Sequence, residues 1–108
     1  MSKYFKEIEE NMQPHFLAKL DEARECAGIP FVINSAYRTK EHNKKVGGKS
    51  NSSHLKGLAV DIRCNTSRNR FIILDSLIAV GFNRIGIADS FIHVDLDLSK
   101  SDNVTWTY

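Results

Sequence analysis

The sequence predicts an α+β fold in which short strands pair antiparallel. Two observations support this class: some segments place apolar residues at helical spacing, and other short runs alternate or are rich in β-branched residues. A third is that only two residues separate the last two strand-like runs, which favours an antiparallel hairpin. With 108 residues and 42% hydrophobic content, we expect one domain over residues 1–108 with a single modest core.

The first half of the chain is expected to contain helices and one strand. The longest helix is predicted over Pro14–Ala27, where apolar residues recur at steps of three and four and a glycine follows. A short helix is expected before it, around Tyr4–Met12, and a short strand after it, over Phe31–Ile33. Thr39 is expected to cap a third helix that runs through about Val46.

The second half begins with an unstructured segment of small polar residues, Gly47–Ser53. A strand is predicted over Leu58–Arg63, and a helix capped by Ser67 is expected to extend to Val80 before a terminating glycine. The hairpin strands are predicted over Arg84–Ala88 and Phe91–Leu96.

The residues after the hairpin are expected to form a polar tail. We expect the carboxylate of Asp97 to be solvated. Trp106 and Tyr108 close the segment and could pack back onto the body of the protein. An aromatic wall of a binding cleft is the alternative for these two side chains, and core packing is the interpretation that we favour.

Composition argues against several classes of protein. The balance of 15 basic and 13 acidic residues, a net charge of +2, lacks the basic excess of a dedicated nucleic-acid binder. Cys26 and Cys64 have no CxxC spacing and are expected to be free thiols. The N-terminus turns charged at once, without the apolar segment of a signal peptide, and no apolar run has transmembrane length. We therefore expect synthesis in a cytoplasm.

His54 and Asp61 form the first pair of candidate metal ligands. His54 follows the polar loop, and Asp61 lies seven positions later inside a predicted strand. Alternation in that strand places Asp61 on the face opposite Val60 and Ile62. Gly57 would let the backbone turn closely under a bound ion. Taken alone, the pair is also compatible with a surface histidine and a carboxylate at a strand end.

His93 and Asp95 share one face of the last predicted strand, because Ile92 and Val94 alternate with them. Two imidazoles and a carboxylate on separate segments resemble the ligand set of a catalytic zinc site, which leaves a position open for water. A carboxylate beside a ligand histidine suits either of two roles, orienting the histidine or acting as a general base. The pattern alone does not separate these roles.

Three ordered motifs are Ser35-Ala36-Tyr37-Arg38, Ser52-x-His54-x-x-Gly57-x-Ala59-x-Asp61 and His93-Val94-Asp95. Together they resemble the M15 family of zinc peptidases, which includes D-alanyl-D-alanine carboxypeptidases, dipeptidases, and L,D- and D,D-endopeptidases of the cell wall. The resemblance runs from about Phe31 to Asp97. It implies Zn²⁺ bound by His54, Asp61 and His93. It also implies a fold like those of hedgehog and D-Ala-D-Ala peptidases, with a small antiparallel sheet flanked by helices.

The resemblance further implies catalytic roles. Arg38 takes the position of the family's arginine, which steadies a substrate carboxylate or the developing oxyanion. Several branches place a catalytic acid three residues before the last histidine ligand, where this chain has Ser90. The neighbouring acids are Asp89 and Asp95. We favour Asp95 as the general base, because the compact branch that ends in His-Val-Asp is most similar to this chain, and Asp89 is the alternative.

The sequence therefore predicts a zinc-dependent metallopeptidase, either a carboxypeptidase or an endopeptidase, that hydrolyses a bond in the stem or cross-link of peptidoglycan. The small size and the lack of an export signal suit a phage lysis or entry enzyme acting at the bacterial cell wall as a monomer. The alternative is a zinc-stabilised cell-wall-binding module with little or no activity, which the serine at position 90 keeps open. We expect neither membrane nor nucleic acid as partner. The lysines around the polar loop are expected to form a solvated face or to attract the anionic wall: Lys40, Lys44, Lys45, Lys49 and Lys56.

Overall fold

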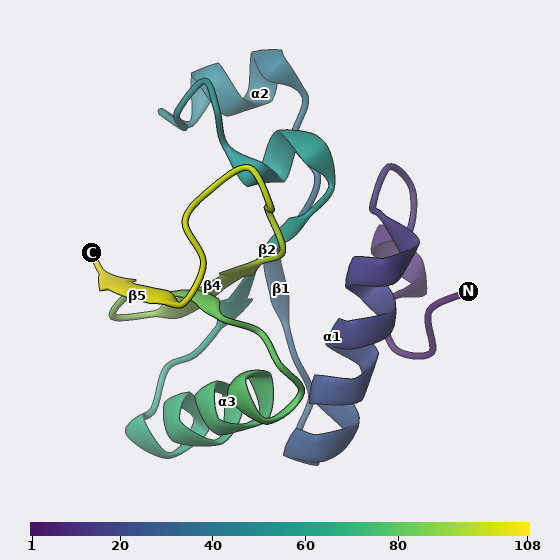
Figure 1. Ribbon diagram of the computed structural model, residues 1–108, viewed down its shortest axis with the longest axis vertical. Helices are drawn as coiled ribbons and strands as arrows, with labels where there is room; N and C mark the ends of the chain where they lie inside the picture. Colours follow the sequence, from purple (N-terminus) through teal and green to yellow (C-terminus); the bar gives the residue numbers. More distant parts are fainter.

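The computed structural model describes residues 1–108 and has an α+β fold with one five-stranded sheet (Figure 1). The three α-helices are α1 (Pro14–Ala27), α2 (Lys40–Lys45) and α3 (Ser67–Ala79). Two short 3-10 helices are η1 (Lys6–Ile8) and η2 (Ser53–Lys56). The strands are β1 (Ile33–Ser35), β2 (Ala59–Arg63), β3 (Arg84–Ile87), β4 (Phe91–Asp95) and β5 (Val104–Thr107).

The strands lie in the order β1-β2-β4-β3-β5, and all neighbours are antiparallel except β3 and β5, which are parallel. Residues that face each other across neighbouring strands lie on the same side of a sheet. One row therefore crosses the sheet from Asp61 on β2 through His93 on β4 and Gly86 on β3 to Trp106 on β5. The neighbouring rows place Val60 beside Val94 on the other side.

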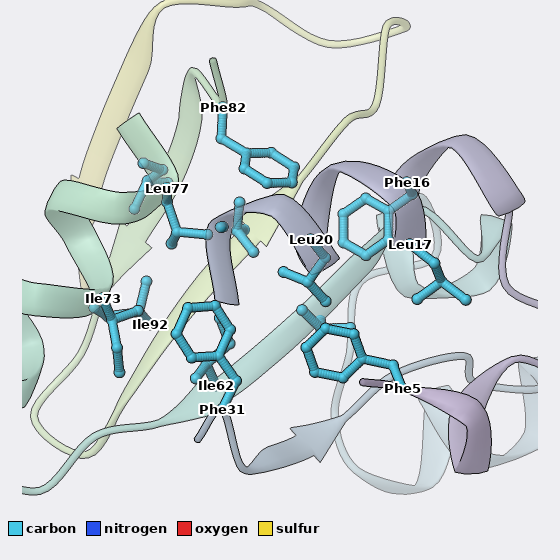
Figure 2. Close-up of a cluster of buried hydrophobic side chains, with 14 of the residues drawn as sticks. Phe5, Phe16, Leu17, Leu20, Phe31, Ile62, Ile73, Leu77, Phe82 and Ile92 are labelled. Atoms are coloured by element: carbon cyan, nitrogen blue, oxygen red, sulfur yellow. The ribbon is translucent and has the colours of Figure 1, made fainter. Parts of the chain in front are cut away.

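Helices α1 and α3 cover the apolar side of the sheet. Helix α1 begins with Pro14 in its first turn and ends at Gly28, whose φ of 69° is the left-handed conformation that glycine adopts without steric cost. Figure 2 shows side chains of α1 and α3 meeting those of β2 and β4 in a single core. The labelled members are Phe5, Phe16, Leu17, Leu20, Phe31, Ile62, Ile73, Leu77, Phe82 and Ile92. This side of the sheet is closed to solvent, so the polar residues of the same strands face away from the helices.

The predicted α+β class is confirmed, and the helix over Pro14–Ala27 has the expected ends. The strand expected over Phe31–Ile33 instead covers Ile33–Ser35, where its residues pair with β2. The cap of α3 is Thr66 rather than Ser67, since the Thr66 hydroxyl accepts a hydrogen bond from the backbone N–H of Asn69 at 3.1 Å. Local preference did not distinguish two adjacent hydroxyl residues, both of which suit a helix cap.

The polar tail contains a strand that was not predicted from the sequence. Its residues Val104–Thr107 form β5 and pair with β3 in parallel, so the sheet is mixed rather than wholly antiparallel. Cys26 is exposed and Cys64 is buried, and both are free thiols as expected. None of the helices combines the length and the apolar character needed to cross a membrane.

Candidate metal centre and its cleft

His54, Asp61 and His93 meet on the side of the sheet that the helices leave open. Asp61 and His93 face each other directly across the pair of strands β2 and β4. His54 comes from η2, whose first turn is capped by Ser52: its hydroxyl accepts a hydrogen bond from the backbone N–H of His54 at 3.2 Å. Gly57 ends η2 with a φ of 68° and returns the chain to β2. Side chains that are 7 to 39 residues apart in sequence thus meet in one place.

The donor atoms of these three side chains converge. The distance from His93 Nδ1 to Asp61 Oδ1 is 2.9 Å, and that from His54 Nε2 to the same oxygen is 3.3 Å. All three ligand atoms lie within 4.8 Å of one another. Ligands bound to zinc at about 2.0–2.2 Å in a tetrahedron are roughly 3.4 Å apart. Two imidazoles and one carboxylate at these separations fit zinc both in chemistry and in spacing.

The other nitrogen of each imidazole is held by a protein acceptor. His54 Nδ1 lies 2.8 Å from the carbonyl oxygen of Ala36, and His93 Nε2 lies 2.7 Å from Asp95 Oδ2. A hydrogen bond from one ring N–H leaves the lone pair of the opposite nitrogen free for a metal. These contacts therefore direct His54 Nε2 and His93 Nδ1 toward Asp61.

Electrostatics keep the carboxylates of the site ionised. Burial by itself would raise the pKa of Asp61, but its contacts with the imidazoles of His54 and His93 outweigh it, so the pKa lies well below its usual range. Burial likewise opposes ionisation of Asp95, yet hydrogen bonds from His93 and Arg84 lower its pKa. Both acids are therefore anions at neutral pH, the form that a ligand or a histidine-orienting group needs.

Arg38 lies beside the three candidate ligands. Its Nη2 is 3.7 Å from Asp61 Oδ2. Its Nε donates to the Ser35 hydroxyl at 3.1 Å, and its Nη1 donates to Asn43 Oδ1 at 3.3 Å. Two hydrogen bonds thus fix the guanidinium at the edge of the site, where it supplies positive charge without being one of the ligands.

The candidate ligands form part of the floor of an open cleft of about 700 Å³. One wall is the polar segment between α2 and η2, which includes Lys49 and Asn51, and the other is β5, which includes Trp106. In Figure 1 the first of these parts lies at the top, next to α2, and β5 lies at the left, at the edge of the sheet. The cleft is large enough for several residues of an extended peptide.

A model of the peptidase M15 family matches residues 2–95, which is most of the chain. The chain belongs to the peptidase M15 family. The match contains the three candidate ligands together with Arg38, and it ends before the loop and strand that complete the cleft. M15 peptidases depend on zinc, which agrees with the donor set described above. No curated protein matches the chain.

The two acids considered for the role of general base lie in different places. Asp95 adjoins His93 and is 1% exposed. Its Oδ2 faces His93, while its Oδ1 accepts hydrogen bonds from Arg84 Nε at 2.6 Å and from the backbone N–H of Asp97 at 3.1 Å. Asp89 is exposed at the turn between β3 and β4 and does not line the cleft. In this arrangement Asp95 orients His93, and the choice of general base between the two acids stays a prediction.

The role of Arg84 was not predicted from the sequence, and the prediction that Asp97 is solvated was wrong. Alternation along β3 puts Arg84 on the side of Gly86, but only the pairing of β3 with β4 brings it to Asp95. Asp97 is 2% exposed rather than solvated. It accepts hydrogen bonds from the Ser53 hydroxyl at 2.7 Å and from Lys56 Nζ at 3.0 Å, which ties the segment after β4 to η2. Ser53 and Lys56 lie more than 40 residues away from Asp97 in sequence, so no local signal could reveal these two contacts.

Proposed function

We propose that the protein is a zinc metallopeptidase that hydrolyses a peptide bond in the stem or cross-link of peptidoglycan. The observation that supports this most strongly is the convergence of two imidazole nitrogens and a carboxylate oxygen at the floor of an open cleft, beside a fixed arginine. The proposal includes action at the bacterial cell wall as a phage lysis or entry enzyme.

His54 Nε2, His93 Nδ1 and an Asp61 oxygen would hold the zinc ion. Bound there, zinc supplies a Lewis acid that polarises the scissile carbonyl and lowers the pKa of a water molecule. The remaining work falls to the protein. The Asp95 carboxylate keeps the proton of His93 on Nε2, so that Nδ1 stays available. Arg38 supplies a fixed positive charge for a substrate carboxylate or for the charge that develops on the carbonyl oxygen.

The test is digestion of purified peptidoglycan, with the released amino groups counted and the fragments identified by mass spectrometry. The zinc-loaded protein should release fragments, and the His54→Ala variant should release none. The matched control is His15→Ala, which removes an exposed histidine on α1 far from the cleft in sequence and should leave digestion unchanged. Loss of fragments in both variants would indicate that substitution of a histidine disturbs the fold. Equal release by wild type and His54→Ala would contradict the proposal.

One observation favours a second candidate, a zinc-stabilised module that binds the cell wall. Position 90 carries serine, Asp95 is engaged with His93 and Arg84, and Asp89 lies outside the cleft. The cleft therefore presents no unengaged carboxylate to act as base. A binding module would sediment with peptidoglycan while releasing no fragments. At saturating zinc, alanine at both Asp89 and Asp95 would leave that binding intact, whereas a peptidase that uses either acid as base would lose turnover.

A further inference from the structure

Strand β5 brings an aromatic side chain to the candidate metal centre from outside the region that the family model matches. The ring centroid of Trp106 lies 5.5 Å from that of His93. The guanidinium carbon of Arg84 lies 5.3 Å from the centroid of the Trp106 ring, while its Nε bonds to Asp95. Trp106 is partly exposed and lines the cleft, so it is not a core residue.

The sheet leaves room for this indole at one position. Gly86 lies between His93 and Trp106 in the row across the sheet. A Cβ atom at Gly86 would stand 2.4 Å from Trp106 Nε1 and 2.9 Å from Tyr108 Cε1. Glycine inside a strand weakens it and commonly marks a close approach by another group. Here the approaching group is an aromatic ring at the edge of the cleft.

The two walls of the cleft differ in character. The β5 wall presents Trp106, Tyr108 and Val104, and Phe91 adjoins it through a ring contact of 5.1 Å with Tyr108. The opposite wall, from Gly47 to Ser53, is polar and carries the exposed Lys49. An extended peptide in such a cleft would turn an apolar side chain toward β5 and its polar groups toward Arg38 and the loop.

We propose that Trp106 is a specificity-determining residue whose indole receives the aliphatic side chain of a substrate residue adjacent to the scissile bond. This inference rests on the proposed peptidase function. Burial of a small aliphatic group against an aromatic ring contributes binding, and it does so equally in the ground state and the transition state. Removal of the indole therefore raises KM and leaves kcat almost unchanged.

The experiment compares synthetic stem peptides that carry either alanine or glycine at each position flanking the bond that is cut. In the Trp106→Ala variant, KM for the alanine peptide should rise about five- to tenfold, and the preference for alanine over glycine should disappear at one of those positions. Trp106→Phe should retain most of the preference. Circular dichroism and zinc content provide the check that each variant is folded and loaded.

Gly86→Ala offers a second route to the same result without removal of the indole. The added methyl group should displace the ring and raise KM as Trp106→Ala does. In a background that already carries Trp106→Ala, the second substitution should raise KM much less than it does in the wild type, because only Tyr108 remains of the two rings that the methyl group would meet. Additive effects of the two changes, or an unchanged alanine preference in folded Trp106→Ala protein, would overturn the inference.

Trp106 is the only tryptophan in the chain, so its fluorescence reports directly on this wall. Addition of the peptide L-Ala-γ-D-Glu-L-Lys-D-Ala-D-Ala to the zinc-loaded protein should shift the emission to shorter wavelength. This readout requires binding but no turnover. An emission shift without digestion of any cell wall would support the inference while the proposed activity fails. Suppose instead that the protein digests the cell wall, that the emission does not shift when the peptide is added, and that KM does not change when the indole is removed. This result would support the proposed activity and overturn the inference.

Discussion

The central strands β2 and β4 and the edge strand β5 line the same cleft but contribute to it differently. Asp61 and His93 lie on the central strands, which have neighbours on both sides and bury alternate residues under α1 and α3. Strand β5 has one neighbour, β3, and most of its side chains are exposed. The difference indicates that two of the three candidate ligands are held by the centre of the sheet, while one wall of the cleft is supplied by its edge.

The centre could be predicted from sequence because its signals are local. Alternation of Val60 and Ile62 with Asp61 assigns the two faces of β2, and the same rule places His93 opposite Ile92 and Val94. With that rule, the short spacing from His54 to Asp61 and the resemblance to the M15 family were sufficient to predict the ligand set. The structure brings those three side chains together.

The edge could not be predicted because its contacts are distant in sequence. The segment around β5 is polar, and it becomes a strand only through parallel pairing with β3, about 20 residues earlier. The pairing also explains why Trp106 faces the cleft, since its position opposite Gly86 sets its side of the sheet. The burial of Asp97 has the same origin, because its partners Ser53 and Lys56 belong to η2.

The largest expected effect within this comparison concerns the link between His93 and Asp95 at the centre. Asp95→Asn should weaken zinc binding about 10- to 100-fold, because the carboxylate that orients the ligand histidine is lost. Competition with a chromophoric chelator would measure the zinc affinity. Asp89→Asn is the matched control, since Asp89 is exposed at a turn, and it should leave the affinity unchanged.

The same variant separates the two roles considered for Asp95. If turnover of Asp95→Asn recovers at saturating zinc, the carboxylate only positions His93. If turnover stays low although the site is full, Asp95 also accepts the proton. An unaltered zinc affinity would show that the contact of 2.7 Å between His93 and Asp95 does not support the metal centre.

A smaller effect is expected from Asp97, which joins the segment between β4 and β5 to η2. Asp97→Asn should lower the free energy of unfolding by about 2 kcal/mol at pH 7, since charge-assisted hydrogen bonds from Lys56 and other donors are lost. Burial alone would raise the pKa of Asp97, but hydrogen bonds from Ser99, Ser53 and Lys56 hold it well below its usual range. Urea denaturation of both proteins measures the difference.

The pH dependence of that difference has a definite sign. A carboxyl group whose pKa is lower in the folded state stabilises the protein above its unfolded pKa of about 4, and this contribution is lost as the pH falls below that value toward the folded pKa. The gap between wild type and Asp97→Asn should therefore be full at pH 7 and at pH 5 and should shrink at pH 3. A gap that stays constant over this range would mean that the charge of Asp97 is not involved.

The smallest effect is expected at the edge, where the Thr105 hydroxyl of β5 donates to the Ile85 carbonyl oxygen of β3 at 2.9 Å. Thr105→Val keeps the shape and should lower the stability by about 1 kcal/mol. Because no candidate ligand lies on β5, zinc affinity should not change, while hydrogen exchange of the β5 amides should become faster. The same substitution at Thr107 provides a control near the end of the strand. A loss of zinc affinity in Thr105→Val would show that edge and centre are coupled, contrary to the division of roles inferred from the sheet.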